Sequence, residues 1–159
     1  MLEFPYHRSV SPLLGVLLGL AIVETIVLHI VVVALWGWTV ALIAGVLDLS
    51  LILALIGLLR AIRRYPVSIA DGRLVMRVGK LRVIPIPLVQ VAGFRSSWDA
   101  AALKQKGVAN LALAAWPNIV IDLSPPVRAG RREVNAVAHR LDEPAVFRDA
   151  VTSLASSSA

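Results

Sequence analysis

Residues 11–59 read SPLLGVLLGLAIVETIVLHIVVVALWGWTVALIAGVLDLSLILALIGLL, an apolar stretch whose one clear interruption is the Trp-Gly-Trp centred on Gly37. A helix rises about 1.5 Å per residue, so about 20 mostly apolar residues cross the roughly 30 Å hydrocarbon core of a bilayer. Residues 12–35 and residues 39–59 each satisfy that length. Two such runs in tandem are improbable in a soluble protein, and no small-residue cleavage site of a signal peptide follows the first. The sequence therefore predicts a transmembrane hairpin of two helices.

Basic residues next to the two spans predict the orientation of the hairpin. Arg8 precedes the first span, and Arg60, Arg63 and Arg64 follow the second, whereas the turn between the spans carries no charge. Basic residues that flank a span stay on the cytoplasmic side of the membrane. We therefore expect a multi-pass protein with both termini in the cytoplasm and a short turn outside.

Three ionisable side chains lie inside the predicted spans, namely Glu24, His29 and Asp48. A charge at the bilayer centre costs at least about 2.5–3.5 kcal/mol, so such groups normally face protein or water. Counted from the turn, Glu24 and Asp48 fall at similar depth, where they could meet with at least one of them protonated. Three interpretations stay open: structural hydrogen bonding, contact with a partner membrane protein or a second copy of the chain, and a proton or cation relay.

The charge of the chain is concentrated after the predicted hairpin. The chain has 159 residues and a formal net charge of +6, and all of its 16 lysines and arginines except Arg8 lie from Arg60 onward. A basic domain attached to a membrane predicts attraction to the anionic lipids of the inner leaflet. The sequence carries no nucleic-acid-binding signature. It has no cysteine, which excludes disulfides, thiolate metal sites and a cysteine nucleophile.

The rest of the chain alternates between apolar and polar residues with turn signals between the runs, which is typical of short strands. An Asp-Gly turn at residues 71–72 and the Asp142-Glu143-Pro144 helix start are the clearest local signals. Strands are expected at 65–70, 73–79, 81–84, 88–94, 111–115, 119–124 and 133–141, with an exposed basic loop at 125–132 and an amphipathic helix at 142–154. The predicted segments are a lead-in (1–11), the hairpin (12–60), a β domain (65–155) and a disordered tail (156–159).

Basic residues of the predicted β domain are its best candidates for binding. Arg73 and Arg77 alternate with apolar residues on one strand, and Lys80 and Arg82 come from the next turn and strand. Together with Arg60, Arg63 and Arg64 they could form a surface for anionic lipid headgroups or an acidic partner. The alternative is that the strand residues are a solvated sheet face and that the three arginines after the second span only set the topology.

The sequence gives no sign of catalysis. The three histidines, His7, His29 and His139, lie before, within and long after the membrane stretch, and His139 is predicted to be a surface residue of the last strand. Metalloprotease, phosphate-loop, dinucleotide-binding and nucleophile-elbow motifs are missing from the sequence. We therefore expect no enzymatic activity, no cofactor, no metal site and no small-molecule substrate.

Three stretches resemble bacterial pleckstrin-homology-like (PH-like) domains. They are DGRLVMR at residues 71–77, IPLVQV at 86–91, and LDEP at 141–144 leading to Phe147 and the last helix. The resemblance covers residues 65–154 and implies a seven-stranded, partly open β-barrel or sandwich capped by a helix. It also implies a small protein of the bacterial inner membrane with a binding role, in which the domain scaffolds a partner protein. The alternative is a small transporter or channel subunit that uses Glu24 and Asp48.

Overall fold

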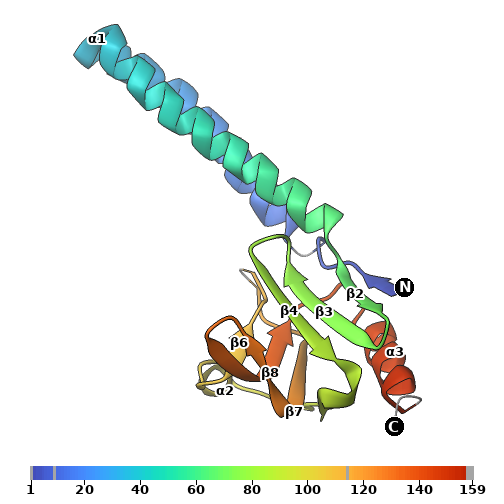
Figure 1. Ribbon diagram of the computed structural model, residues 1–159. Helices are drawn as coiled ribbons and strands as arrows, with labels where there is room; N and C mark the ends of the chain where they lie inside the picture. Colours follow the sequence, from blue (N-terminus) through green and yellow to red (C-terminus); the bar gives the residue numbers. More distant parts are fainter. Residues whose placement is uncertain (1, 9, 114, 157–159) are drawn as a thin grey trace. The chain divides into compact units, whose positions relative to one another are not determined.

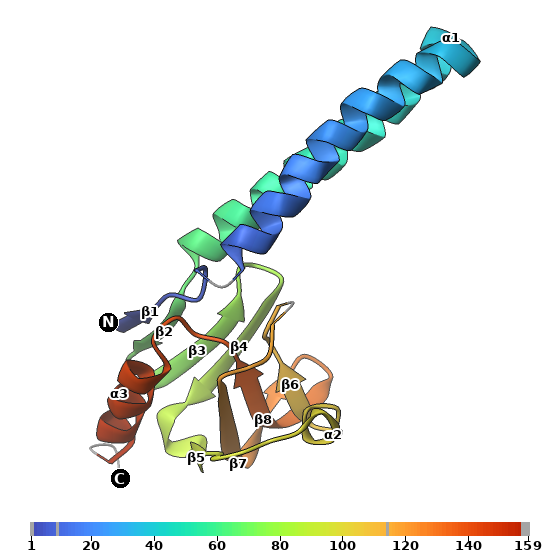
Figure 2. The ribbon, with the colours of Figure 1, turned by 180° about the vertical axis from the view of Figure 1, so that it is seen from behind.

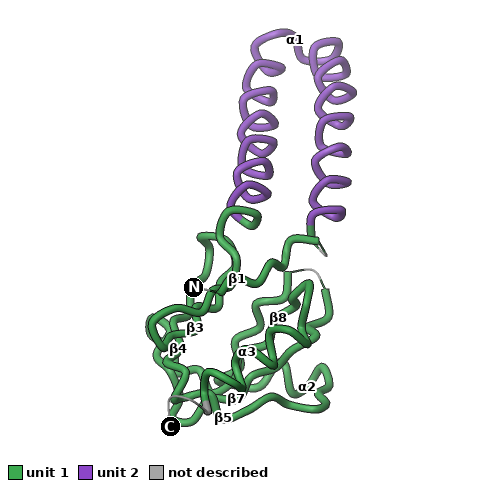
Figure 3. Tube along the Cα trace, turned by 90° about the vertical axis from the view of Figure 1, so that its right-hand side faces the viewer, with its two compact units in different colours: residues 1–10, 62–159 green, residues 11–61 purple. Residues whose placement is uncertain are grey.

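The computed structural model describes residues 2–8, 10–113 and 115–156 (Figures 1 and 2). The chain divides into two compact units (Figure 3). We call Ser11–Ala61 the helical unit, and Met1–Val10 together with Ile62–Ala159 the β unit. The predicted tail at 157–159 lies outside the described residues. Ser156, which was also assigned to that tail, is the last residue of a helix.

The helical unit consists of the apolar helix α1, which runs Ser11–Arg64 and extends slightly into the β unit. Its backbone is not helical at Gly37, where φ is 82° and ψ is 179°, so two helical segments join there. Figure 3 shows the two arms on either side of this break lying side by side. Only glycine adopts such a φ without strain, which explains why the break falls at this residue. The break coincides with the predicted turn.

Helix α1 is long and apolar enough to cross a membrane, and it is the one described helix of which this is true. The most apolar part of α1 buries no residue within the structure. The two arms meet along a seam, where Ala41 is buried and a Cβ placed on Gly45 would lie 3.3 Å from Cε1 of His29. Most leucine, isoleucine and valine side chains of the arms therefore point outward.

The β unit is built from two four-stranded sheets. Strand order is β1-β2-β3-β4 in the first sheet, all antiparallel, and β5-β7-β8-β6 in the second, where β6 runs parallel to β8. The first sheet contains β1 (Leu2–Phe4), β2 (Val67–Ala70), β3 (Arg73–Val78) and β4 (Arg82–Pro87). The second contains β5 (Val91–Phe94), β6 (Val108–Asn110), β7 (Ile119–Ala129) and β8 (Arg132–His139). The helices are η1 (Leu88–Gln90), α2 (Ala100–Leu103) and α3 (Pro144–Ser156).

This architecture is α+β, and no closed barrel forms among the described residues. Seven strands, β2 to β8, fall in the region where seven were predicted, but they belong to two separate sheets. The strand expected at 111–115 was wrong: β6 lies before it at Val108–Asn110, and residues 111–113 and 115 are not in a strand. The eighth strand, β1, lies in the predicted lead-in and pairs Phe4 with Val67. A three-residue strand is too short to show a period-two pattern, so only its pairing with β2 reveals it.

The expected basic loop at residues 125–132 is mostly strand. β7 continues to Ala129 and β8 begins at Arg132, so the turn is reduced to Gly130 and Arg131. The pairing register between β7 and β8 shifts between Asp122 and Val127. Prolines are tolerated in a strand at such an irregularity, because the ladder there needs no hydrogen bond from them. The sequence-based prediction ended this strand at residue 124 because two prolines follow, and that end was wrong.

The core of the β unit includes the inward side chains of β3 and the apolar face of α3. Leu74, Met76 and Val78 are buried, as predicted from the sequence. Helix α3 lies next to β1 and β2 in both views (Figures 1 and 2). Its Phe147 is fully buried and makes edge-to-face contacts with Phe4 at 5.0 Å and with Phe94 at 6.1 Å between ring centroids.

The turn between β2 and β3 provides a direct test of local backbone chemistry. Asp71 and Gly72 both have positive φ, 50° and 69°, as a type I′ hairpin turn requires. We expect Gly72→Ala to lower the free energy of unfolding by about 1 kcal/mol, because a Cβ is disfavoured at this φ even though it meets no neighbour. Asp71→Gly is the matched control and should not destabilise the chain. Urea unfolding measures both, and an unchanged Gly72→Ala midpoint would contradict the expectation.

Candidate functional site

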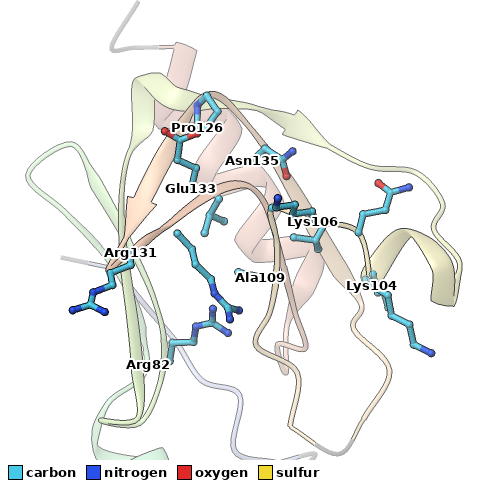
Figure 4. A pocket seen from close by; sticks show the side chains of 14 residues that line it. Arg82, Lys104, Lys106, Ala109, Pro126, Arg131, Glu133 and Asn135 are labelled. Atoms are coloured by element: carbon cyan, nitrogen blue, oxygen red, sulfur yellow. The ribbon is translucent and has the colours of Figure 1, made fainter.

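The β unit has a basic pocket of about 820 Å³ (Figure 4). Three segments that are distant in sequence form it: the start of β4, the loop from α2 to β6, and the β7–β8 hairpin. We call this feature the basic pocket. Its lining includes the basic residues Arg82, Lys104, Lys106, Arg131 and Arg132 and one acidic residue, Glu133.

Strand register explains why Arg82 lies in the pocket. Arg82 pairs with Val78, and Ile84 pairs with Met76, so Arg82 occupies an inner-face position at the end of the first sheet. Residues directly opposite each other in an antiparallel pair share a face of the sheet. The row of buried apolar side chains on this face of β4 thus ends at Arg82. Arg82 is exposed, which places its charge in the pocket and not in the core.

The loop that carries Lys104 and Lys106 is held in place by backbone contacts. The carboxylate of Asp99 caps α2 by accepting a hydrogen bond from Ala102 N at 2.7 Å. At the other end, the backbone N–H of Asn135 donates to Gly107 O at 2.9 Å. Gly107 has a φ of 92°, and a Cβ there would lie 2.8 Å from Oδ1 of Asn135. Glycine is therefore needed for the loop to approach β8 this closely.

The charges in the basic pocket are not neutralised by neighbouring acids. Within the described ranges, the ion pairs are His7 with Asp142 at 4.0 Å and Arg95 with Asp122 at 2.7 Å, and neither involves a pocket residue such as Glu133. Arg95, by contrast, is paired. It donates three hydrogen bonds to Asp122, and these raise the pKa of Arg95. The pocket is therefore a concave surface of positive charge that no acidic side chain of the described ranges pairs.

The predicted basic surface of the strands divides into different environments. Arg73 and Arg77 lie on the outer face of the first sheet, opposite in direction to Leu74 and Met76. Arg77 is half-buried, and Lys80 lies 5.3 Å from the ring centroid of Tyr65. Only Arg82 of this set reaches the basic pocket. The four residues therefore do not form one surface, because pairing places Arg82 on the inner face.

The predicted arginines after the second span are all exposed. Arg60, Arg63 and Arg64 belong to the last turns of α1, and no hydrogen bond or ion pair within the described chain engages them. Their positive charges at the C-terminal end of a helix are favourable for the helix dipole.

The ionisable groups of the apolar arms do not form a cluster. Glu24 is exposed, whereas His29 and Asp48 are half-buried in the seam between the arms. The ring of His29 lies near Gly45 and at 6.4 Å from the ring of Trp38. Across the described helical unit, no hydrogen bond or ion pair joins Glu24 to Asp48. The next residue, Thr25, is half-buried, whereas Glu24 is one helical step away from it and exposed. The carboxylate of Glu24 therefore points outward.

His139 is buried, so the prediction of a surface residue was wrong. It is 1% exposed, its Nε2 donates to Arg77 O at 3.0 Å, and its Nδ1 accepts from Arg140 N at 2.7 Å. Burial is the main reason that its pKa falls to about 4, and the hydrogen bond from Nε2 to Arg77 O opposes this shift. The sequence of β8 lacks a clear alternation of apolar and polar residues because both faces of this strand are covered. Ala136, Val137 and Ala138 are all buried.

The described residues hold no group of three or more histidine, aspartate or glutamate side chains placed to bind a metal ion. The contacts of His139 are to backbone groups and to the ring of Tyr6, at 5.0 Å between centroids. The basic pocket is therefore the strongest candidate site. Sequence reasoning missed it because Arg131 and Arg132 fall in the loop predicted at 125–132, whereas Lys106 lies between two predicted strands far from that loop in the sequence. Only the tertiary structure brings these segments together.

Comparisons with protein-family models, with curated proteins and with solved structures find no match for this chain.

Proposed function

We propose that this chain is a non-enzymatic binding protein of a bacterial inner membrane. In this proposal α1 is a two-span anchor, and the β unit is a PH-like domain in the cytoplasm that contacts anionic lipids and scaffolds a partner protein. The observation that carries the proposal is the combination of a long apolar helix whose side chains point outward with a β unit whose basic pocket lacks acidic partners among the described residues.

The dimensions of α1 support two spans. The break at Gly37 leaves arms of about 26 residues, and each is about 39 Å long at 1.5 Å per residue. Each arm is therefore longer than the roughly 30 Å hydrocarbon core. In water the exposed apolar surface of both arms would be unfavourable, since monomeric soluble proteins rarely expose such large contiguous patches.

The order of elements in the β unit supports the PH-like assignment. The strands β2 to β8 are followed by one amphipathic helix, α3, whose Phe147 and Val151 are fully buried. Of the two forms that the resemblance implies, a barrel and a sandwich, the presence of two sheets favours the sandwich. Such a fold is a scaffold, so its function depends on the residues that it displays. The basic pocket is the most distinctive of these.

A channel or transporter subunit has less support. That function would require Glu24 and Asp48 to act together, and Glu24 is exposed on the outside of its arm. An outward carboxylate in a bilayer favours a contact with a membrane partner or a second copy of this chain. Proton flux into reconstituted liposomes that is lost in Glu24→Gln and in Asp48→Asn would favour the channel instead.

Single-cysteine variants test the anchor directly, because the native chain has no cysteine. We expect Thr39→Cys, next to the turn, to react with a membrane-impermeant maleimide in intact cells. Ala145→Cys, at the start of α3, should react only after the inner membrane is permeabilised. Both side chains are exposed in the structure, so burial does not limit labelling. Recovery of the chain in the soluble fraction, or labelling of Ala145→Cys from outside, would contradict the proposed topology.

A further inference from the structure

We infer that the basic pocket is a binding site for a phosphate group, with Arg82, Lys106 and Arg132 as its principal ligands. This inference rests on the proposed function, since it assigns anion binding by the β unit to one site. It differs from the surface predicted from the strands, because Lys106 and Arg132 were not part of that surface. Charge, shape and side-chain chemistry each support it.

The charge balance of the pocket favours binding of an anion. Five basic residues and one acidic residue line it, and within the described chain none of the five is in an ion pair. Like charges held together repel one another, and the repulsion grows where protein replaces part of the surrounding water. A bound anion removes that repulsion and gains charge-assisted hydrogen bonds. The cluster is therefore better suited to hold a ligand than to stabilise the free fold.

The shape of the pocket selects a small ligand. Its volume of about 820 Å³ lies within the range of small-molecule sites, which is about 300–1,000 Å³. In Figure 4 the side chains of Arg82 and Lys106 point toward the space between the three segments, whereas Lys104 and Arg131 lie at its margin. The hydrogen bond from Asn135 N to Gly107 O holds the loop that presents Lys106. The site is thus largely formed before a ligand arrives.

Side-chain chemistry favours phosphate over other anions. Arginine presents a planar fork of N–H donors that matches two oxygens of a phosphate, and lysine adds a compact point charge. Two arginines and a lysine from three segments line the same pocket, an arrangement that suits a tetrahedral, multiply charged group. Single-stranded nucleic acid is disfavoured because none of the described residues that line the pocket is an aromatic one that could stack against a base.

Two sources could supply the phosphate, a lipid headgroup or a soluble phosphorylated molecule. The test uses the full chain in nanodiscs and pyrophosphate as the soluble probe, with calorimetric titration. We expect saturable binding in discs of zwitterionic lipid. If the source is lipid, discs that contain phosphatidylglycerol should weaken pyrophosphate binding by competition. If the source is soluble, the lipid composition should leave the affinity unchanged. Both results support a phosphate site in the pocket.

A matched pair of double variants locates the binding. Arg82→Glu/Arg132→Glu changes the pocket, and Arg73→Glu/Arg128→Glu changes exposed arginines that do not line it. Each pair lowers the net charge from +6 by four, to +2. We expect the pocket pair to weaken pyrophosphate binding more than about tenfold, since two charge-assisted contacts are lost and replaced by repulsion. The matched pair should change it less than about threefold.

Two results would overturn the inference. One is an absence of saturable pyrophosphate binding in the native chain in both kinds of disc, and the other is an equal loss in both double variants. Equal loss would mean that binding is diffuse, which leaves the proposed function standing without this site. Lys106→Gln is a milder second variant for which we expect a smaller, measurable loss. Unfolding midpoints of all variants confirm that the affinities refer to folded protein.

Discussion

Lowering the pH from 7 to 4 is expected to decrease the free energy of unfolding of the β unit by about 3 kcal/mol through His139 alone. The pKa of His139 is about 4 in the folded protein against a reference value of 6.5. Between these two values the unfolded chain binds more protons than the folded one, so stability rises with pH. The contribution is therefore complete above about pH 6.5 and is lost as the pH falls toward 4.

The geometry around His139 explains why protonation is unfavourable. Nε2 already donates to a carbonyl oxygen, of Arg77, and Nδ1 accepts from the backbone N–H of Arg140. A proton added at Nδ1 would face another donor and replace an acceptor. The imidazole is also closed off from water, and its nearest ring neighbour, Tyr6, is itself buried with a raised pKa. No acidic side chain among the described residues pairs with it.

Urea unfolding of the purified chain at several pH values measures this effect. The control is His139→Gln, whose side-chain amide can donate to Arg77 O but does not titrate. We expect the variant to be less stable at pH 7 and to lose about 3 kcal/mol less than the native chain between pH 7 and 4. Comparing the two chains removes the contributions of aspartate and glutamate, which titrate in both. Parallel pH curves would show that His139 is not the group responsible.

Replacement of Phe147 by alanine should have the largest effect of any single substitution on the β unit, about 3–5 kcal/mol. Phe147 is fully buried and makes edge-to-face contacts with Phe4 and Phe94. The three rings join β1, β5 and α3, which come from the beginning, the middle and the end of the sequence. Removing the central ring leaves a cavity and also removes the aromatic contacts. The short strand β1 should therefore detach before the rest of the unit unfolds.

Val146→Ala provides the matched control, because Val146 is next to Phe147 on α3 but is 55% exposed. A surface substitution of this kind usually changes stability by less than about 0.5 kcal/mol. Urea midpoints compare the two variants, and hydrogen exchange of the β1 and β2 amides reports the detachment of β1. Equal midpoints for Phe147→Ala and Val146→Ala would contradict the packing described for α3.

Local signals were sufficient for several elements of the β unit. The alternation of Leu74, Met76 and Val78 and the start of α3 at Pro144 follow from residues that are neighbours in sequence. β1 and the end of β7 were misjudged because their signals depend on pairing. β1 has only three residues, and β7 passes through Pro125 and Pro126 at a register shift. Propensity alone cannot indicate either, since the partner strand decides both.

The basic pocket shows the same limit for the site. Each of its basic residues is visible in the sequence as a charge, Arg82 in a predicted strand and the others between predicted strands. Nothing local distinguishes Lys106 or Arg132 from other surface cations. Convergence depends on the register of β3 with β4, which turns Arg82 inward, and on the contact of Gly107 with β8. His139 is the opposite case. Both faces of β8 are covered, so His139 is buried at a position that would be exposed in a strand with one solvated face.

The sequence by itself determined the apolar stretch with its break at Gly37, the basic character of residues 60–159, and the amphipathic pattern of the last helix, because each depends on residues close together in the chain. Only the tertiary structure decided which charges share a pocket, which strand ends the first sheet, and that His139 is buried. These features depend on contacts between residues far apart in sequence, and such contacts form through register and packing that no local pattern specifies.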